Sequence, residues 1–128
     1  MPLRCLIVDD SPRFLDAARS LLERQGITVV GSASNSVEAL QRATELRPDV
    51  ILIDIDLGGE SGFELARQLL REAGKSRSAV ILISTHCEQD YAELIAASPA
   101  LGFLPKAAVS AGAIQKLLAR HNENSGAD

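Results

Sequence analysis

Five runs of continuous apolar residues, separated by segments with helical spacing, constrain the fold of this 128-residue chain more than any other feature. The runs are rich in Val, Ile and Leu and do not alternate with polar residues. This pattern is typical of strands that are buried on both faces of a parallel sheet. We therefore expect strands at residues 3–9, 27–33, 49–55, 79–84 and 101–105.

The segments between these runs carry recognisable helix ends. The first has Ser11 as N-cap and Pro12 at the first helical position, and Gly26 ends it. Further helices are expected at residues 37–46, 61–74, 90–97 and 110–120. Because strands that alternate with helices of this length require right-handed crossovers, the sequence predicts an α/β fold, a doubly wound (βα)5 sandwich around a parallel sheet.

The length gives room for one core, which we expect in residues 1–121, followed by a polar tail at 122–128. A formal net charge of −4 argues against the basic surface of a nucleic-acid binder. The apolar runs are too short to span a bilayer and no signal-peptide pattern is present, so we expect a cytoplasmic protein without membrane contact. Cys5 and Cys87 are expected to be packing residues rather than a disulfide.

Polar residues follow four of the predicted strands, at the sheet edge where ligands bind in such folds. They are Asp9 and Asp10, Asp54 and Asp56, Ser84, and Lys106. Converging carboxylates repel one another and lose hydration, so they require a cation. Oxygen ligands suit Mg²⁺ or Mn²⁺ better than Zn²⁺. Beside such a metal, a carboxylate can attack a phosphoryl group whose oxygens are held by a hydroxyl and an ammonium.

These residues, together with the loop 58–62 and the Gly-Phe-Leu-Pro that precedes Lys106, resemble the receiver domain of two-component response regulators over essentially the whole chain. The resemblance implies a flavodoxin-like fold with strand order 2-1-3-4-5. It also implies a signalling switch that is phosphorylated by a sensor histidine kinase or a phosphotransfer protein. Its only chemistry would be Mg²⁺-dependent phosphotransfer to itself and slow self-dephosphorylation.

The resemblance assigns a role to each acidic residue of the predicted site. Asp54 would be the phosphoacceptor. Asp10, Asp54 and the backbone carbonyl of Asp56 would bind Mg²⁺ directly, and Asp9 would act through water. The side chain of Asp56 would tune the lifetime of the phosphoryl group.

The remaining roles implied by the resemblance concern the phosphoryl group and the switch. Ser84 and Lys106 would contact the phosphoryl group, and Ser84 and Phe103 would convert phosphorylation into a change at the surface. Phe103 is open to a second interpretation, as a core residue. His86 would influence the water that hydrolyses the phosphoryl group, or is an ordinary loop residue.

Three residues depart from the usual receiver pattern. Gly58 stands where many receivers have Pro, Thr85 where a small residue is usual, and Ala107 where Pro often follows the lysine. The last departure is similar to receivers that precede helix-turn-helix output domains. Two interpretations stay open, a stand-alone regulator and the receiver part of a longer protein. A homodimer through the fourth helix, fifth strand and fifth helix, residues 90–120, is a further hypothesis.

Two other functions compete with the switch. The Asp54-Ile-Asp56 sequence superficially resembles the opening motif of haloacid-dehalogenase-type phosphatases, but the chain has no length for a cap domain, and that function leaves Asp9 and Asp10 unexplained. A flavodoxin-like nucleotide binder would need a phosphate loop rich in Ser, Thr and Gly after the first strand. Asp9 and Asp10 would instead repel an unchelated phosphate.

Overall fold

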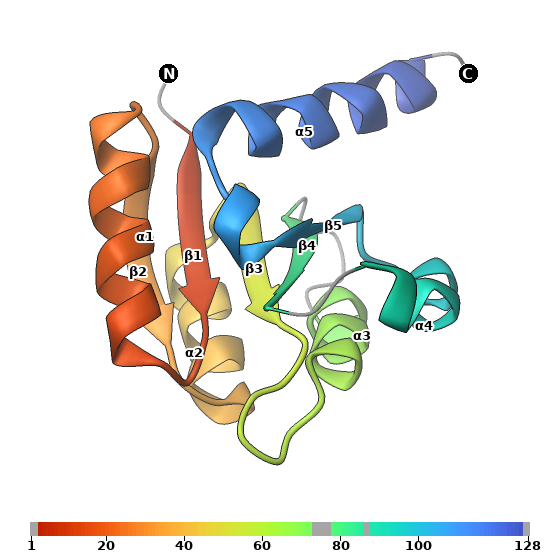
Figure 1. The fold of residues 1–128 in the computed structure, drawn as a ribbon, viewed down its shortest axis with the longest axis horizontal. Helices are drawn as coiled ribbons and strands as arrows, with labels where there is room; N and C mark the ends of the chain where they lie inside the picture. Colours follow the sequence, from red (N-terminus) through yellow and green to blue (C-terminus); the bar gives the residue numbers. More distant parts are fainter. Residues whose placement is uncertain (1–2, 73–77, 86–87, 127–128) are drawn as a thin grey trace.

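A computed structural model describes residues 3–72, 78–85 and 88–126, which form a five-stranded parallel sheet covered by helices (Figure 1). The strands lie in the order β2-β1-β3-β4-β5, as expected. Their bounds are β1 Arg4–Val8, β2 Thr28–Ala33, β3 Val50–Asp54, β4 Ala79–Ser84 and β5 Gly102–Pro105. The helices are α1 Pro12–Arg24, α2 Ser36–Leu46, α3 Gly62–Glu72, α4 Ala92–Ala97 and α5 Ala111–Gly126, with short 3-10 turns η1 Glu88–Tyr91 and η2 Lys106–Ala108.

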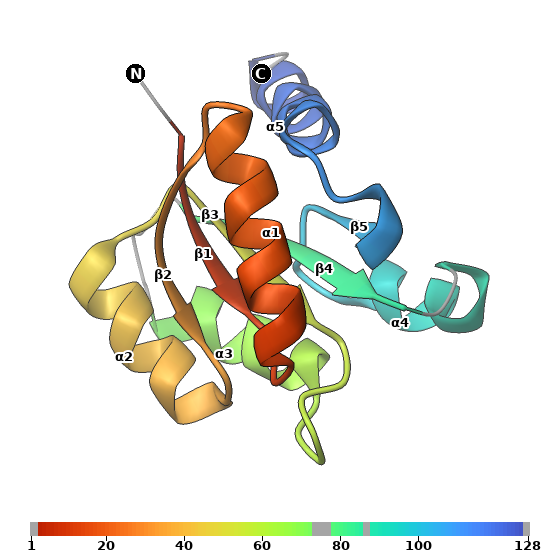
Figure 2. The ribbon, with the colours of Figure 1, turned by 60° about the vertical axis from the view of Figure 1, so that its left-hand side comes forward.

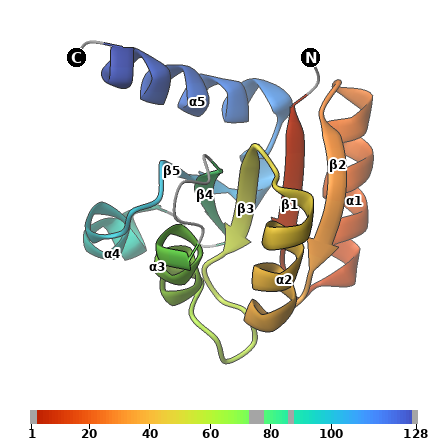
Figure 3. The same ribbon diagram turned by 180° about the vertical axis from the view of Figure 1, so that it is seen from behind.

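Alternate residues of each strand enter two separate cores, because successive side chains of a strand point to opposite faces. One core packs under α2, α3 and α4 and takes Leu6, Val8, Ile51, Ile53, Val80 and Leu82 from the strands. The other packs under α1 and the first turns of α5 and takes Cys5, Ile7, Val50, Leu52, Ile81 and Ile83. Figure 2 shows α1 on one face of the sheet, and Figure 3, seen from behind, brings α2 and α3 in front of it. This two-sided burial explains why the strands read as continuous apolar runs.

The ends of α1 form as the sequence predicts. The backbone N–H of Phe14 donates to Ser11 Oγ over 3.3 Å, and Pro12 is the first helical residue. Gly26 follows the helix with φ +95°, a conformation that costs glycine little. Ser11 therefore fixes the turn that leads from β1 into α1, directly after Asp9 and Asp10.

Two helices differ from the expected bounds. The fourth begins with the turn η1, and Tyr91, which precedes α4, makes no side-chain capping bond. A helix start without such a bond leaves backbone N–H groups unpaired, and a tighter 3-10 turn satisfies some of them. Helix α5 continues to Gly126, past the expected end at Arg120, and so takes up most of the expected tail. No proline interrupts residues 121–126, so the helical hydrogen bonds continue.

Cys5 is fully buried and free, and its burial raises the pKa of the thiol to about 12. This agrees with a packing role, whereas Cys87 lies outside the described residues. Within the described part of the chain, none of the helices has the length and apolar character needed to cross a membrane.

Candidate functional site

The two central strands bring the acidic residues together. In the parallel pair β1 and β3, Val8 lies opposite Ile53, so Asp9 and Asp54 follow at the same level of the sheet. Asp9, Asp10 and Asp54 each offer a carboxylate oxygen, and these three oxygens all lie within 4.8 Å of one another. Three of the predicted carboxylates therefore converge at this edge of the sheet, whereas the exposed carboxylate of Asp56 is not in the cluster.

Asp9 is the most buried of the three, with no exposed surface. Its Oδ1 accepts a 2.8 Å hydrogen bond from the backbone N–H of Ser11. Its Oδ2 has no hydrogen-bond partner of good geometry and lies 2.6 Å from Lys106 Nζ. A buried carboxylate oxygen held only by an ion pair is costly. Such an oxygen can accept a hydrogen bond from a water molecule that coordinates a cation.

Asp54 is also buried, at 6% exposure, and both of its carboxylate oxygens have partners. Oδ1 accepts from the backbone N–H of Asp56 over 3.2 Å, and Oδ2 accepts from Lys106 Nζ over 3.1 Å. Burial raises the pKa of Asp54, and the hydrogen bond from Lys106 offsets this increase only in part. The site thus holds more negative charge than its lysine neutralises.

Lys106 joins the two buried carboxylates. Partial burial lowers its pKa, but the close contacts with the carboxylates of Asp9 and Asp54 outweigh that effect and raise the pKa above its usual value. The ammonium also lies 4.7 Å from the centre of the Phe14 ring. That distance is typical of a cation–π contact. Lys106 is therefore charged, and its ammonium contacts Asp9, Asp54 and the Phe14 ring.

The loop between β3 and α3 closes the site beside Asp10. Gly58 has φ +63°, and a Cβ placed on it would lie 2.8 Å from Oδ2 of Asp10. Proline, common at this position in receivers, fixes φ near −65° and could not adopt this conformation. The glycine therefore leaves room for the Asp10 carboxylate. Asp10 itself is exposed, so solvent reaches the cluster from this side.

Three of the four predicted switch and tuning residues, Ser84, Phe103 and Asp56, belong to the described part of the chain. Ser84 ends β4, opposite Pro105, and is buried at 3% exposure, whereas the neighbouring Thr85 is exposed. Phe103 is 7% exposed and packs in the core under α3 and α4. The exposed side chain of Asp56 accepts from the backbone N–H of Gly58 over 3.2 Å. His86 lies outside the described residues.

Two side chains near the site were missed from the sequence. Phe14 carries no local signal of a role at the site, because its contact with Lys106 joins residues far apart in the chain. Glu60 was noted only as part of a loop, yet its carboxylate bonds to Ser36. No local signal points to this contact, because Ser36 lies 24 residues from Glu60 in the sequence.

The donor set fits a hard divalent cation. Asp9, Asp10 and Asp54 offer carboxylate oxygens, which are the ligand type that Mg²⁺ and Mn²⁺ take, and water can complete the coordination from the exposed Asp10 side. Oδ2 of Asp9, which lacks a hydrogen-bond partner of good geometry, and the room that Gly58 leaves for the Asp10 carboxylate agree with this use.

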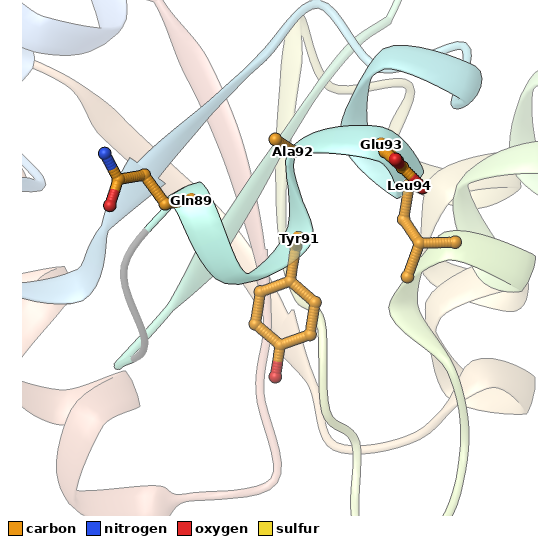
Figure 4. Close-up of a pocket in the computed structure, with 5 residues that line it drawn as sticks. All are labelled: Gln89, Tyr91, Ala92, Glu93 and Leu94. Carbon is orange, nitrogen blue, oxygen red and sulfur yellow. The ribbon is translucent and has the colours of Figure 1, made fainter.

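A shallow pocket on another part of the molecule contains none of the predicted site residues. Figure 4 shows its lining, which comes from η1 and α4 and consists of Gln89, Tyr91, Ala92, Glu93 and Leu94. The Tyr91 ring packs 6.2 Å from the ring of Phe63, whereas Leu94 is half exposed. Four of its five lining residues lie within residues 90–120, the face expected to meet partners.

Comparison with known proteins points to one family. The model of the response regulator receiver domain family matches residues 5–119. The response regulator GacA of Pseudomonas viridiflava is 32% identical over 117 residues, which cover 90% of this chain and 53% of GacA. Protein PilH of Pseudomonas aeruginosa is 39% identical over 82 residues, covering 64% of this chain and 67% of PilH.

A solved structure agrees with this assignment. The two-component response regulator of the LuxR family from Aurantimonas sp. SI85-9A1 superposes with a TM-score of 0.79 at 27% identity, covering 93% of this chain and 84% of that one. The chain spans only about half the length of the curated relative GacA.

Proposed function

The chain belongs to the response regulator receiver family, and from this premise we propose that Asp54 is the residue that accepts the phosphoryl group. The observation that carries the proposal is the position of its buried carboxylate, which lies 3.1 Å from the Lys106 ammonium and close to the carboxylates of Asp9 and Asp10. The family function, a phosphorylation switch in two-component signalling, needs one such nucleophile beside a cation site.

The residues around Asp54 would have separate roles in the transfer of the phosphoryl group. Asp10, Asp54 and the backbone carbonyl of Asp56 would hold Mg²⁺, and Asp9 would act through water. When bound, the metal would offset the negative charge of the phosphoryl oxygens. An Asp54 oxygen would attack phosphorus, forming an acyl phosphate O–P bond while the P–N bond of a donor phosphohistidine breaks. The donor imidazole keeps the electron pair of that bond.

Lys106 and Ser84 would then hold the transferred group. Lys106 Nζ already lies 3.1 Å from Asp54 Oδ2, so it needs only to turn from the carboxylate to a phosphoryl oxygen. Ser84 ends the neighbouring strand β4. Its movement toward the phosphoryl group would free space near β5, which Phe103 could enter, and this would change the surface of α4 and β5. Asp56 and His86 would tune hydrolysis.

We propose that the domain acts in signalling and catalyses no reaction beyond phosphotransfer to itself and its own dephosphorylation. The phosphatase alternative would use the Asp56 carboxylate as general acid, but that side chain is exposed and accepts from the Gly58 N–H. The nucleotide-binding alternative is opposed by the acidic cluster after β1. The receiver unit would span residues 1–121, with the sensor kinase or a phosphotransfer protein as phosphoryl donor.

Incubation of the chain with Mg²⁺ and acetyl phosphate tests this function. We expect intact-mass spectrometry to detect a single phosphoryl adduct that is lost at alkaline pH, as an acyl phosphate should be, and that does not form when EDTA removes the metal. A panel of phosphate esters serves as the control for general phosphatase activity. Steady turnover of several esters, or an adduct that survives alkali, would contradict the switch.

We also propose that α4, β5 and α5 form a homodimer interface on phosphorylation. The 50% exposed side chain of Leu94 gives this face an apolar contact point. Sedimentation velocity with and without a phosphoryl mimic should show a dimer only with the mimic, because the switch must first alter this face. Leu94→Ser should lower the dimer fraction severalfold, since a buried apolar contact is replaced by a hydroxyl. An unchanged sedimentation coefficient in the wild type would exclude this dimer.

A further inference from the structure

We propose that Glu60 is a positioning residue for the metal site: it fastens the loop between β3 and α3 to the start of α2, and so sets the direction of the Asp56 backbone carbonyl. The inference rests on the proposed function, because it concerns that carbonyl as a Mg²⁺ ligand. Figures 1 and 3 show the loop beside the end of α2 that is nearest the carboxyl ends of the strands.

The link between the loop and α2 consists of two hydrogen bonds that Ser36 donates to the Glu60 carboxylate. The backbone N–H of Ser36 donates to Glu60 Oε1 over 2.9 Å, and Ser36 Oγ donates to Oε2 over 2.6 Å. Ser36 is the first residue of α2, where backbone N–H groups have no partner within the helix. Both bonds favour the charged carboxylate and lower the pKa of Glu60, the side-chain bond most. Glu60 is thus an anionic anchor at neutral pH.

The anchor reaches the metal site through the backbone. The carbonyl of Glu60 accepts a 3.0 Å hydrogen bond from the N–H of Leu57. This N–H and the carbonyl of Asp56 belong to the same planar peptide group and point in opposite directions. A bond that fixes the direction of the N–H therefore also fixes the direction of the Asp56 carbonyl.

The loop needs such an anchor because its tip consists of two glycines. Gly58 and Gly59 have φ +63° and +101°. Glycine loses more conformational freedom on ordering than any other residue, so a loop with two of them is loose unless contacts hold it. On one side the buried side chain of Leu57 holds the loop to the core. On the other side the bonds between Glu60 and Ser36 hold it.

Glu60 would act through position and not as a ligand. Both of its oxygens are engaged by Ser36, and the group of carboxylates suited to a metal is formed by Asp9, Asp10 and Asp54. Removal of Glu60 should therefore affect the metal through the geometry of the loop. A change of net charge alone should not reproduce the effect.

Glu60→Ala tests the proposal, with Glu64→Ala as the matched control. Glu64 is an exposed carboxylate in the first turn of α3 that pairs with Arg67, so its removal changes the charge equally without touching the loop anchor. Two quantities are measured: the Mg²⁺ dissociation constant by titration calorimetry, and the exchange rate of the Leu57 amide in the metal-free protein by ¹H–¹⁵N NMR.

We expect Glu60→Ala to weaken Mg²⁺ binding about tenfold, the low end for loss of a group that orients a metal ligand. The Leu57 amide should exchange faster, and Glu64→Ala should match the wild type in both measurements. Ser36→Ala keeps its backbone N–H and should show a smaller effect in the same direction. Wild-type values for Glu60→Ala in both measurements, or equal weakening by Glu64→Ala, would overturn the proposal.

The two proposals fail in different ways. A wild-type chain that binds no Mg²⁺ contradicts the proposed function itself. In that case the exchange rate of Leu57 still decides whether Glu60 holds the peptide. If the wild type and Glu60→Ala bind Mg²⁺ with the same affinity, the proposed function stands and only the positioning role of Glu60 is contradicted.

Discussion

Replacement of Asp54 by Asn is expected to abolish formation of the phosphoryl adduct with acetyl phosphate and Mg²⁺. The amide has almost the shape of the carboxylate, so the fold is kept, but it carries no charge and is a poor nucleophile. It also removes one oxygen anion from the cluster that would hold the metal. Intact-mass spectrometry measures the adduct, and we expect it to fall below detection.

Asp16→Asn is the control for this experiment, because Asp16 is an exposed carboxylate on α1. It should accept phosphate as the wild type does. Peptide mapping of the wild-type adduct, after reduction of the acyl phosphate, should place the modification on Asp54. An adduct of wild-type amount on the Asp54→Asn protein would show that another residue is the nucleophile.

Replacement of Lys106 by Met is expected to cost the metal-free protein about 3 kcal/mol of unfolding free energy, as is usual when one partner of a buried ion pair is removed. Met keeps an unbranched stem beside the Phe14 ring and removes the ammonium, with its charge and its hydrogen bond to Asp54. Asp9 and Asp54 then face each other without a cation. Because small domains are stable by only about 5–15 kcal/mol, a loss of this size should be plain in urea denaturation.

The pH dependence of this loss follows from the pKa of Asp54. Burial raises that pKa even with Lys106 present, and removal of the lysine should raise it further. A carboxyl whose folded pKa is raised loses stability as the pH rises from its unfolded pKa through its folded pKa. The difference between Lys106→Met and the wild type should therefore be small in acid and largest near neutral pH.

Urea denaturation of Lys106→Met is repeated with Mg²⁺ and compared with a control variant. Mg²⁺ at about 100 times its dissociation constant adds about 2.7 kcal/mol to the stability of a protein that binds it only when folded. We therefore expect Mg²⁺ to recover much of the loss in Lys106→Met. Lys116→Ala removes an exposed lysine of α5 and should leave the urea midpoint unchanged. An equal midpoint for both variants would mean that Lys106 does not neutralise the buried carboxylates.

The sheet could be predicted because its strands are buried on both faces. Burial of both faces requires continuous apolar sequence, and this signal is local to each strand, so all five strands formed within the expected ranges. Ser11 was predictable as a cap for a similar reason, since the capping bond joins residues three positions apart. Helix ends without such a local signal were less predictable, as the start of α4 and the end of α5 show.

The site was predictable as a set of residues but not as a set of contacts. In a parallel sheet the carboxyl ends of neighbouring strands meet, so Asp9 and Asp54, which follow the adjacent strands β1 and β3, had to come close once the topology was expected. Lys106 follows β5, which β4 separates from β3, and the topology places it only at the same edge of the sheet. The individual distances depend on side-chain conformations, which the sequence does not specify. The family resemblance supplied roles for these residues that spacing alone would not have given.

The sequence by itself determined the alternation of strands and helices and the edge of the sheet at which the acidic residues and the lysine gather, because periodicity and strand ends are local properties of a chain. Only the tertiary structure decided that Phe14 lies beside Lys106, that Oδ2 of Asp9 is buried beside that lysine, and that Glu60 bonds to Ser36. Each of these contacts joins segments that meet only after the sheet has closed and the helices have packed on it.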